Sequence, residues 1–451
     1  MGKTERRLFG TDGIRGIANA PPMTPETVLR VGKAVADVFK KQNGRTHKVV
    51  IGKDTRLSGY MIETALTSGL VSMGVEVMLV GPLPTPAIAH LTKSLNADAG
   101  IVLSASHNPA SHNGIKIFDS KGFKLSDAVE LEIERVVFSG KELGNNNSIG
   151  KAFRVNEAKG RYIEYVKGTV DNTSLKGFKI VVDCANGAAY NVVPAVFSEL
   201  GVEVKAINVF PDGLNINLNC GALHPEGMQR AVKETGANVG FAFDGDADRV
   251  IACNEKGELL DGDQIMALCA KKLLDDGKLK KKTVVATVMS NLGFHEAMRK
   301  EGINVRTTAV GDRYVIEEMK SNSFNFGGEQ SGHIIFGDYS TTGDGLITAL
   351  QLLRIMKETR KPLSELSGLM NRFPQVLINV NVREKKPFEM MPAVSMAVKD
   401  AESVLGKNGR VLLRYSGTEN IARVMLEGKN EKLINSLASK IVASIKKEIG
   451  A

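Results

Sequence analysis

The sequence contains no tryptophan and only four cysteines in 451 residues. These cysteines, Cys184, Cys220, Cys253 and Cys269, lie far apart, so none has the paired spacing of a zinc site or a thiol redox motif. Scattered cysteines of this kind are typical of a reducing compartment. We therefore expect a cytoplasmic protein without structural disulfides.

Aromatic residues are also scarce, at 5% of the chain. The lysines and arginines behind the net charge of +9 are scattered or occur in short runs such as KLKKKT. Nucleic-acid binding usually combines a basic surface with aromatic residues that stack on bases, and the sequence offers little of either pattern. We expect no nucleic-acid partner, and the positive charge suits a small anionic substrate.

Long apolar runs are missing as well. No stretch approaches the ~18 apolar residues of a membrane helix, and the N-terminal MGKTERRLFG lacks the apolar core of a signal peptide. No membrane association is expected. The composition, 43% hydrophobic and 24% charged, is that of a globular protein. At roughly 100 to 200 residues per domain, the length suggests three or four domains.

What the sequence does contain is an internal repeat of α/β units, in which strand patterns alternate with helix-length stretches. A first strand is expected in HKVVIGKDT, FKIVVDCANG and KTVVATVMSN, and a second in GVEVMLV, GVEVKAI and GINVRTT. The third copies are DAGIVLSASHNP, NVGFAFDGDADR and NFGGEQSGH, in which Ser106, Asp246 and His333 stand six residues after the glycine. Ligands bind beyond the carboxyl ends of strands in open α/β sheets, so we expect the three loops to converge on one cleft.

After about residue 373 the pattern changes to a few strands and a long terminal helix, which predicts a smaller domain. The predicted fold class is therefore α/β, with three consecutive similar mixed-sheet domains followed by a C-terminal α+β domain. The expected domain boundaries are 1–153, 154–256, 257–372 and 373–451.

The first polar loop, SASHNP, follows a buried strand. Asn108 and Pro109 end regular structure there, which leaves Ser104 and Ser106 at the strand's exit, where a hydroxyl can act as a nucleophile. Ser106 is the preferred candidate. The alternative is that both serines only satisfy backbone groups in a turn. A serine hydrolase is disfavoured because the GxSxG motif is missing.

The second polar loop, DGDADR, places Asp244, Asp246 and Asp248 at alternate positions directly after an apolar strand. Three carboxylates within ~4 Å repel one another by several kcal/mol at intermediate dielectric, so an ordered cluster calls for a cation. Oxygen ligands favour Mg²⁺ or Ca²⁺ over zinc. A calcium EF-hand does not fit, because Arg249 replaces the required glycine and a strand precedes the loop. A solvated acidic turn is the alternative.

Two further motifs suit a polar, phosphorylated ligand. GGEQSGH offers hydrogen-bonding groups on a glycine-rich frame, which suits recognition of several hydroxyls. RYSGTENIAR combines arginines and hydroxyls with the amides of a glycine-containing turn, which suits a phosphate dianion, although a hairpin with surface arginines would look the same. The four motifs together favour phosphoryl transfer on a phosphosugar, with a nucleophilic serine beside a divalent cation.

In this order along the chain, RLFGTDGIRG, SASHNP, FPDGLNINLNCGALHPE, FAFDGDADR, VGDRYV, GGEQSGH, TTGDG and LLRYSGTE make the sequence resemble the α-D-phosphohexomutases. The resemblance implies a four-domain, heart-shaped enzyme that binds Mg²⁺ and a phosphosugar. A phosphoserine would donate its phosphate, a sugar 1,6-bisphosphate would form, and the serine would be rephosphorylated from the other end of the sugar. The resemblance leaves the oligomeric state open between monomer and homodimer.

Carried over position by position, the resemblance identifies Ser106 as the phosphoserine, which would also complete the metal site of Asp244, Asp246 and Asp248. Lys116 is the favoured general acid or base. Near the proton transfer we also expect Arg15, His107 and His333. Substrate contacts are expected from Arg249, Glu329, Ser331, Arg414, Ser416, Gly417, Thr418 and Arg423, the last five in a C-terminal phosphate-binding lid.

Within the family, Ser104 and Gln330 favour glucosamine phosphate over mannose or glucose phosphate, because those relatives usually have Thr and Met there. The implied reaction interconverts glucosamine 6-phosphate and glucosamine 1-phosphate, with glucosamine 1,6-bisphosphate as intermediate and activator, and supplies amino-sugar nucleotides and cell-wall precursors. The alternatives are a phosphomannomutase or phosphoglucomutase, a metal-dependent sugar phosphatase with an aspartyl nucleophile in FAFDGD, and a non-catalytic sugar-phosphate sensor.

Overall fold

The computed structural model describes residues 7–10, 12–40, 47–144, 148–171, 173–416 and 420–451. By internal contacts the chain forms two compact units. The larger comprises Met1–Met289 and Glu301–Leu369, and the smaller Ser290–Lys300 and Met370–Ala451. In the described part of the chain, no helix has the length and apolar character needed to span a membrane. All four cysteines are buried free thiols, so none forms a disulfide.

The first sheet of the larger unit has seven strands in the order β1-β2-β6-β5-β3-β4-β7. β3 pairs in parallel with β4 and β5, and β6 returns antiparallel to β5. The strands are β1 (Phe9–Gly10), β2 (Gly13–Ile17), β3 (Lys48–Lys53), β4 (Glu76–Pro82), β5 (Ala99–Leu103), β6 (His112–Asp119) and β7 (Ala152–Arg154). The accompanying helices are α1 (Pro25–Lys40), α2 (Ser58–Val71), α3 (Thr85–Ser94) and α4 (Asp127–Phe138).

The central strands of this sheet are buried on both faces, which explains why β3 and β5 read as nearly unbroken apolar runs. Glycines let α3 approach the sheet closely. A Cβ at Gly52 would lie 2.2 Å from the Ile88 side chain, and one at Gly100 would lie 2.0 Å from Thr92 Oγ1. Larger residues at these two positions would push α3 away from the sheet, and with it the polar residue at its start, Thr85.

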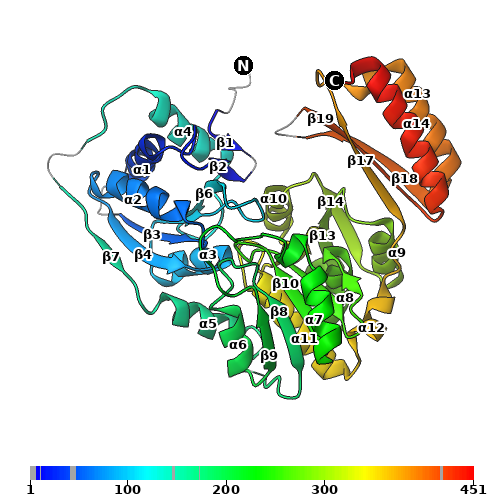
Figure 1. Ribbon diagram of the computed structural model, residues 1–451, viewed down its shortest axis with the longest axis horizontal. Coiled ribbons are helices and arrows are strands. Elements are labelled where there is room, and N and C mark those ends of the chain that lie inside the picture. The colour runs from blue at the N-terminus through cyan, green and yellow to red at the C-terminus, as the bar shows by residue number, and fades with distance from the viewer. Residues whose placement is uncertain (1–6, 11, 41–46, 145–147, 172, 417–419) are drawn as a thin grey trace. The chain divides into compact units, whose positions relative to one another are not determined.

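The second sheet has five strands in the order β12-β11-β10-β8-β9, and the third has four in the order β14-β13-β15-β16. Their strands are β8 (Lys179–Asp183), β9 (Glu203–Ile207), β10 (Val239–Phe243), β11 (Val250–Asn254), β12 (Leu259–Leu260), β13 (Thr283–Thr287), β14 (Asn304–Thr308), β15 (Phe326–Gly328) and β16 (Ile334–Phe336). The helices of this region are α5 (Ala158–Gly168), α6 (Val193–Glu199), α7 (Glu226–Thr235), α8 (Gly262–Asp275), α10 (Asp312–Asn322), α11 (Gly345–Thr359) and α12 (Leu363–Leu366) (Figure 1).

The three sheets share one arrangement, which confirms the predicted repeat. The order β4-β3-β5-β6 of the first sheet recurs as β9-β8-β10-β11 and as β14-β13-β15-β16. In each copy the first three strands are parallel and the fourth is antiparallel. Each polar motif is therefore the loop between the third strand and its antiparallel neighbour.

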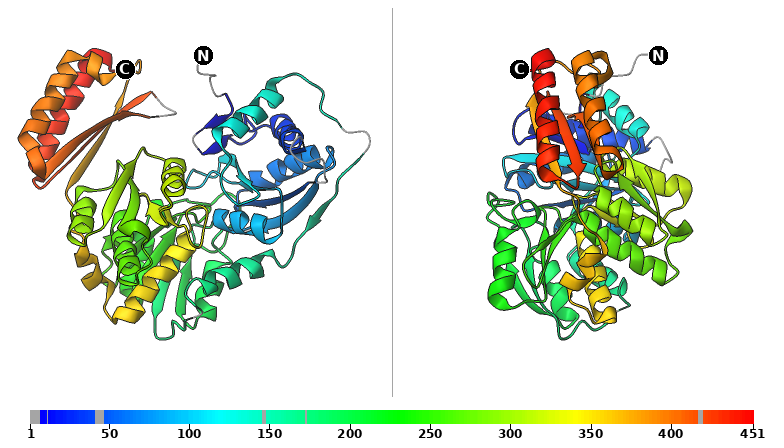
Figure 2. Two further views of the ribbon diagram at one scale, coloured as in Figure 1. Left: turned by 180° about the vertical axis from the view of Figure 1, so that it is seen from behind. Right: turned by 90° about the vertical axis from the view of Figure 1, so that its right-hand side faces the viewer.

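The smaller unit contains an antiparallel sheet in the order β17-β19-β18, with α13 and α14 packed against it (Figure 2). Its elements are β17 (Gln375–Asn381), α13 (Pro392–Leu405), β18 (Gly409–Tyr415), β19 (Ile421–Gly428) and α14 (Glu431–Ile449). Short 3₁₀ turns lie at Phe388–Met390 and Gly406–Asn408 in this unit, and at Gly221–Leu223, Lys280–Lys282 and Ser367–Leu369 in the larger one. The predicted α+β domain is thus present.

One segment of the predicted third domain belongs by contacts to the smaller unit. The loop before α9 (Leu292–Lys300) is bonded to it through Asn291, whose Nδ2 donates to Phe373 O at 3.0 Å and to Glu427 Oε1 at 3.2 Å. The Leu292 amide donates to Glu427 Oε2 at 3.1 Å. The four expected domain boundaries remain a prediction, and this segment departs from a simple division along the chain.

Candidate active site

The three polar loops of the repeat meet in space, as the topology predicted. We call residues 104–111 the serine loop, residues 244–249 the acidic loop and residues 329–333 the glutamate loop. Ser106 Oγ donates a hydrogen bond to Asp244 Oδ2 at 2.6 Å, which joins the first two loops. His333 Nδ1 lies 3.5 Å from Asp248 Oδ1, which joins the third loop to the second.

In the serine loop the two serines have different surroundings. Ser106 adopts a left-handed backbone, with φ of 52°, and its amide donates to Ser104 Oγ at 2.9 Å. The Ser104 hydroxyl is fully buried and donates to Asp54 Oδ2 at 2.6 Å. Ser104 therefore supports the loop, while the hydroxyl of Ser106 is directed at the acidic loop.

A buried arginine holds the backbone of the serine loop. The Arg56 side chain is fully buried, and its Nε donates to Asp54 Oδ2 at 2.8 Å. Its Nη2 donates to the carbonyl oxygens of Ser106 at 3.0 Å and Asn108 at 2.7 Å. Its Nη1 donates to the carbonyls of Pro109 and His112, the latter at 3.0 Å. One guanidinium therefore satisfies four carbonyls, three of them in the serine loop outside any helix or strand and the fourth at His112, the first residue of β6.

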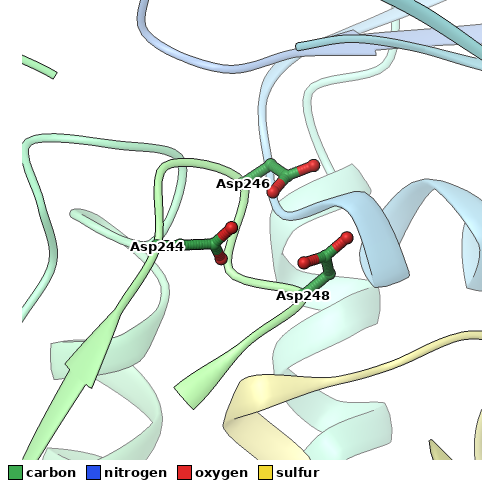
Figure 3. A group of neighbouring side chains, drawn as sticks. All are labelled: Asp244, Asp246 and Asp248. Carbon is green, nitrogen blue, oxygen red and sulfur yellow. The ribbon is translucent and has the colours of Figure 1, made fainter. Parts of the chain in front are cut away.

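The acidic loop directs three carboxylates toward one another (Figure 3). Asp244, Asp246 and Asp248 are buried, and each offers a ligand oxygen within 4.8 Å of the others. Asp246 Oδ2 accepts from Thr85 Oγ1 at 2.6 Å, but Asp246 Oδ1 is buried and has no hydrogen bond among the described residues. Clustered buried carboxylates with an unsatisfied oxygen fit a hard divalent cation. Burial and the charges of Asp248 and Asp246 raise the pKa of Asp244 well above its usual range, which a bound cation would reverse.

Lys116, on β6, contributes the positive charge nearest to this cluster. Its Nζ lies 2.9 Å from Asp246 Oδ2, 3.2 Å from Asp248 Oδ2 and 3.3 Å from Asp12 Oδ2. Burial opposes the charge, but these three carboxylates raise the pKa of Lys116 well above its usual range. Of the two roles expected for Lys116, the protonated form in this geometry suits the acid rather than the base.

Of the other residues expected near proton transfer, His107 contacts Ser106 directly, while Arg15 and His333 contact its neighbours in the site. His107 Nδ1 lies 3.2 Å from Ser106 Oγ, and burial, with help from Arg249 and Arg15, lowers the pKa of His107 to about 4. Arg15 pairs with Asp12 and reaches the carbonyl of Ala105 at 3.5 Å. The amide of Gly343 donates to His333 Nε2 at 3.0 Å, which places the ring proton on Nδ1, facing Asp248.

The expected sugar-binding residues are placed less uniformly. Glu329 is buried, and its Oε1 accepts from the Gly311 amide at 3.0 Å. Ser331 is exposed on the same loop. Arg249 closes the acidic loop, and its amide donates to Asp244 Oδ1 at 3.2 Å. Gln330, the residue expected to favour an amino sugar, donates to Asp261 Oδ2 at 3.4 Å.

In the smaller unit, Arg414 on β18 and Arg423 on β19 are direct partners across the antiparallel pair. Like charges facing each other on adjacent strands destabilise a sheet, and an anion bound between them would offset that repulsion. Ser416, also expected to bind phosphate, is buried, and its carbonyl accepts from Lys385 Nζ at 2.8 Å. Gly417 and Thr418, which complete that expectation, lie outside the described residues.

Several site residues escaped the sequence reasoning. Asp54 and Arg56 follow the first strand of the repeat in KDTRLS, and Thr85 follows the second strand in LPTP. The same rule that located the polar loops, polar residues at the carboxyl ends of parallel strands, could have found them. Asp12, and Asn217, which contacts the Ser106 carbonyl, come from irregular segments that no strand pattern directly precedes, so this rule could not have found them. Lys124 and Asp312 form an ion pair at the edge of the site, and Asp12 also pairs with Lys124.

The chain matches all four domains of the phosphoglucomutase/phosphomannomutase family: α/β/α domain I over residues 6–144, domain II over 160–257, domain III over 261–373 and the C-terminal domain over 377–444. It therefore belongs to that family.

Among individual proteins, the phosphoglucosamine mutase of Syntrophotalea carbinolica is 55% identical over 99% of this chain and 98% of its own. A phosphoglucomutase/phosphomannomutase family protein from Burkholderia thailandensis has the same fold, with a TM-score of 0.81 at 24% identity, covering 98% of this chain and 99% of that one. The N-acetylphosphoglucosamine mutase of Aspergillus fumigatus, solved with GlcNAc-6P and magnesium, gives a TM-score of 0.68 at 18% identity, covering 98% of this chain and 96% of that one.

Proposed function

We propose that this chain is a mutase that interconverts glucosamine 6-phosphate and glucosamine 1-phosphate through a phosphorylated Ser106 and a glucosamine 1,6-bisphosphate intermediate. The observation that carries the proposal is the 2.6 Å hydrogen bond from Ser106 Oγ to Asp244, which places a nucleophilic hydroxyl at the edge of three buried carboxylates. Full-length identity of 55% to a phosphoglucosamine mutase supports the choice of sugar. Within this proposal the chain acts in the cytoplasm, on a small phosphosugar.

The three aspartates are the residues that would hold Mg²⁺, together with an oxygen at Ser106. Their donor set, all carboxylate oxygen, suits a hard cation such as Mg²⁺. When bound, the cation would neutralise charge on the phosphoryl group during transfer. The unsatisfied Asp246 Oδ1 favours a bound cation over a bare acidic cluster.

The remaining residues of the site orient the substrate and move protons. Lys116, 2.9 Å from Asp246, is a protonated amine that can donate to a departing sugar oxygen. His107 stays neutral near pH 7, with its Nδ1 facing Ser106 Oγ, so in the same step, transfer of phosphate from the sugar to the serine, it can accept the serine proton. Glu329 and Ser331 would bind sugar hydroxyls, and Arg249 would bind phosphate. Arg414, Ser416, Gly417, Thr418 and Arg423 would bind the phosphate that is not being transferred.

The test is isomerisation by the purified, full-length protein with Mg²⁺ and a catalytic amount of glucosamine 1,6-bisphosphate. We expect glucosamine 1-phosphate to form from glucosamine 6-phosphate, with a higher kcat/KM than for mannose 1-phosphate or glucose 1-phosphate. Release of inorganic phosphate without isomer would instead identify a phosphatase. Intact mass should show one phosphate on the wild type after treatment with bisphosphate and none on Ser106→Ala. A phosphate retained on Ser106→Ala would contradict the mechanism.

A further inference from the structure

We infer that Asn217 is a positioning residue for phosphoryl transfer, because it fixes the serine loop of the first α/β domain to the second domain, which carries the acidic loop. The inference rests on the proposed phosphoryl transfer through Ser106. Asn217 lies in the FPDGLNINLN segment, which leads from β9 toward the 3₁₀ turn at Gly221–Leu223 and has no role in the chemistry described above.

The contacts of Asn217 coincide with those of Arg56. Asn217 Nδ2 donates to the carbonyl oxygen of Ser106 at 2.8 Å and to that of Asn108 at 3.0 Å. These are the same two oxygens that accept from Arg56 Nη2. A carbonyl oxygen has two lone pairs, so each of these carbonyls accepts one donor from its own domain and one from the neighbouring domain.

The backbone around Asn217 is built for this contact. Asn217 has a left-handed φ of 59°, and its own amide donates to Ala185 O at 2.9 Å. Gly245 of the acidic loop leaves room for the junction. A Cβ there would lie 2.6 Å from Ser106 O and 2.8 Å from Asn217 Nδ2. The Ser106 carbonyl, the Asn217 amide and the acidic loop thus touch at one point, where a larger residue than glycine would not fit.

The consequence concerns the distance between the nucleophile and the carboxylates. Ser106 and Asp244 come from different domains, so their 2.6 Å hydrogen bond depends on how the two domains are held together at this point. Arg56 can shape the serine loop, but it belongs to the same domain as that loop and cannot fix it to the other one. Two nearby bonds also cross the boundary: Thr55 Oγ1 to Asn186 O at 2.5 Å and the Leu57 amide to Gly213 O at 2.9 Å. Asn217 is the side chain among them that holds Ser106 itself. Displacement of a reacting group by about 1 Å can reduce a rate by about 100-fold.

The experiment compares Asn217→Gly with Asn219→Gly. Asn219 is two residues away, exposed, and also left-handed, with φ of 52°, so both changes put glycine in the same kind of backbone conformation. We expect Asn217→Gly to lower kcat by about 10- to 100-fold with KM changed less than about two-fold. Asn219→Gly should match the wild type. Asn217→Asp, which keeps the shape but loses the donors, should be impaired at least as much as Asn217→Gly.

A second measurement separates this inference from the proposed substrate. Intact mass is followed over time after glucose 1,6-bisphosphate and Mg²⁺ are added, which reports phosphorylation of Ser106 whatever sugar the enzyme prefers. Slower phosphorylation of Asn217→Gly than of Asn219→Gly supports the inference, even if no variant turns over glucosamine phosphate. Equal phosphorylation rates and equal kcat for the two glycine variants would overturn it.

Discussion

Replacing Ser104 with alanine tests whether the two serines have the separate roles that the geometry gives them. The Ser104 hydroxyl donates to Asp54 at 2.6 Å and accepts from the Ser106 amide at 2.9 Å, and it is fully buried. A buried hydrogen bond to a charged group contributes about 1.5–3 kcal/mol, and one between neutral groups about 0.5–1.5 kcal/mol. The free energy of unfolding of Ser104→Ala should therefore fall by about 2–4 kcal/mol.

For a domain of about 150 residues, such as the expected first domain, this loss corresponds to a fall in Tm of about 5–10 °C, measured by calorimetry or circular dichroism. Ser106→Ala also removes buried hydrogen bonds, from Ser106 Oγ to Asp244 at 2.6 Å and to His107 Nδ1 at 3.2 Å, so its Tm should fall by a similar amount. Ser111→Ala, an exposed change in the same loop, is the matched control.

Activity should separate the two variants. Measured well below its Tm, Ser104→Ala should retain turnover within about ten-fold of the wild type, while Ser106→Ala should lose nearly all of it, because the covalent intermediate cannot form. Two results would refute the reasoning. One is an unchanged Tm for Ser104→Ala, and the other is a folded Ser104→Ala that is as inactive as Ser106→Ala.

Asp246→Asn should raise the Mg²⁺ concentration needed for half-maximal activity and abolish the Mg²⁺-dependent rise in Tm. The exposed control Asp275→Asn should change neither quantity. Unchanged Mg²⁺ titrations for the Asn variants of Asp244, Asp246 and Asp248 would rule out the metal site. Arg414→Ala should raise KM and make turnover more dependent on added bisphosphate. The exposed Lys440→Ala is the control. Equal bisphosphate dependence of the two variants would contradict phosphate binding by Arg414. The His90 ring stacks on Tyr165 with 3.8 Å between ring centroids, and burial lowers the pKa of His90 to about 4, so the ring is neutral in the folded protein near pH 7. The contribution of His90 to stability is therefore fully present above pH ~6.5 and is lost as pH falls toward 4. Because His90 is partly exposed, we expect a contribution of about 1–2 kcal/mol, seen as a shallower loss of stability between pH 7 and 5 in urea unfolding of His90→Gln; parallel curves would show that His90 does not titrate across folding.

Sequence reasoning located the three loops that meet in the candidate site, because each lies at the same place in a repeat that is visible as a local pattern. Ser106, Asp246 and His333 stand at the same distance from a strand glycine, and a strand's exit is visible in the sequence as an apolar run followed by polar residues. The α/β class and the terminal α+β domain followed from the same alternation. Local patterns of this kind survive folding because the sheet edge imposes them directly.

The supports of the site could not be predicted in the same way. Arg56 is fully buried, although a lone arginine in a polar stretch normally indicates surface. Its partners are main-chain carbonyls about 50 residues away, and a carbonyl looks the same at every position of a sequence. Asn217 is 111 residues from Ser106 and belongs to another domain. The grouping of residues 290–300 with the terminal unit depends likewise on contacts between distant segments.

Arg56 and Asn217 hold the serine loop through its carbonyl oxygens, so this part of the loop's support does not depend on the side chains that follow Ser106. Substitutions at positions such as 108, 110 and 111 therefore leave this support in place, provided that the backbone conformation is kept. Specificity can then change through mutations in other loops without Ser106 being repositioned each time. A scaffold of this kind would let the other loops of the site vary in evolution around one fixed serine, and it offers protein engineers a fixed hydroxyl around which to vary the rest.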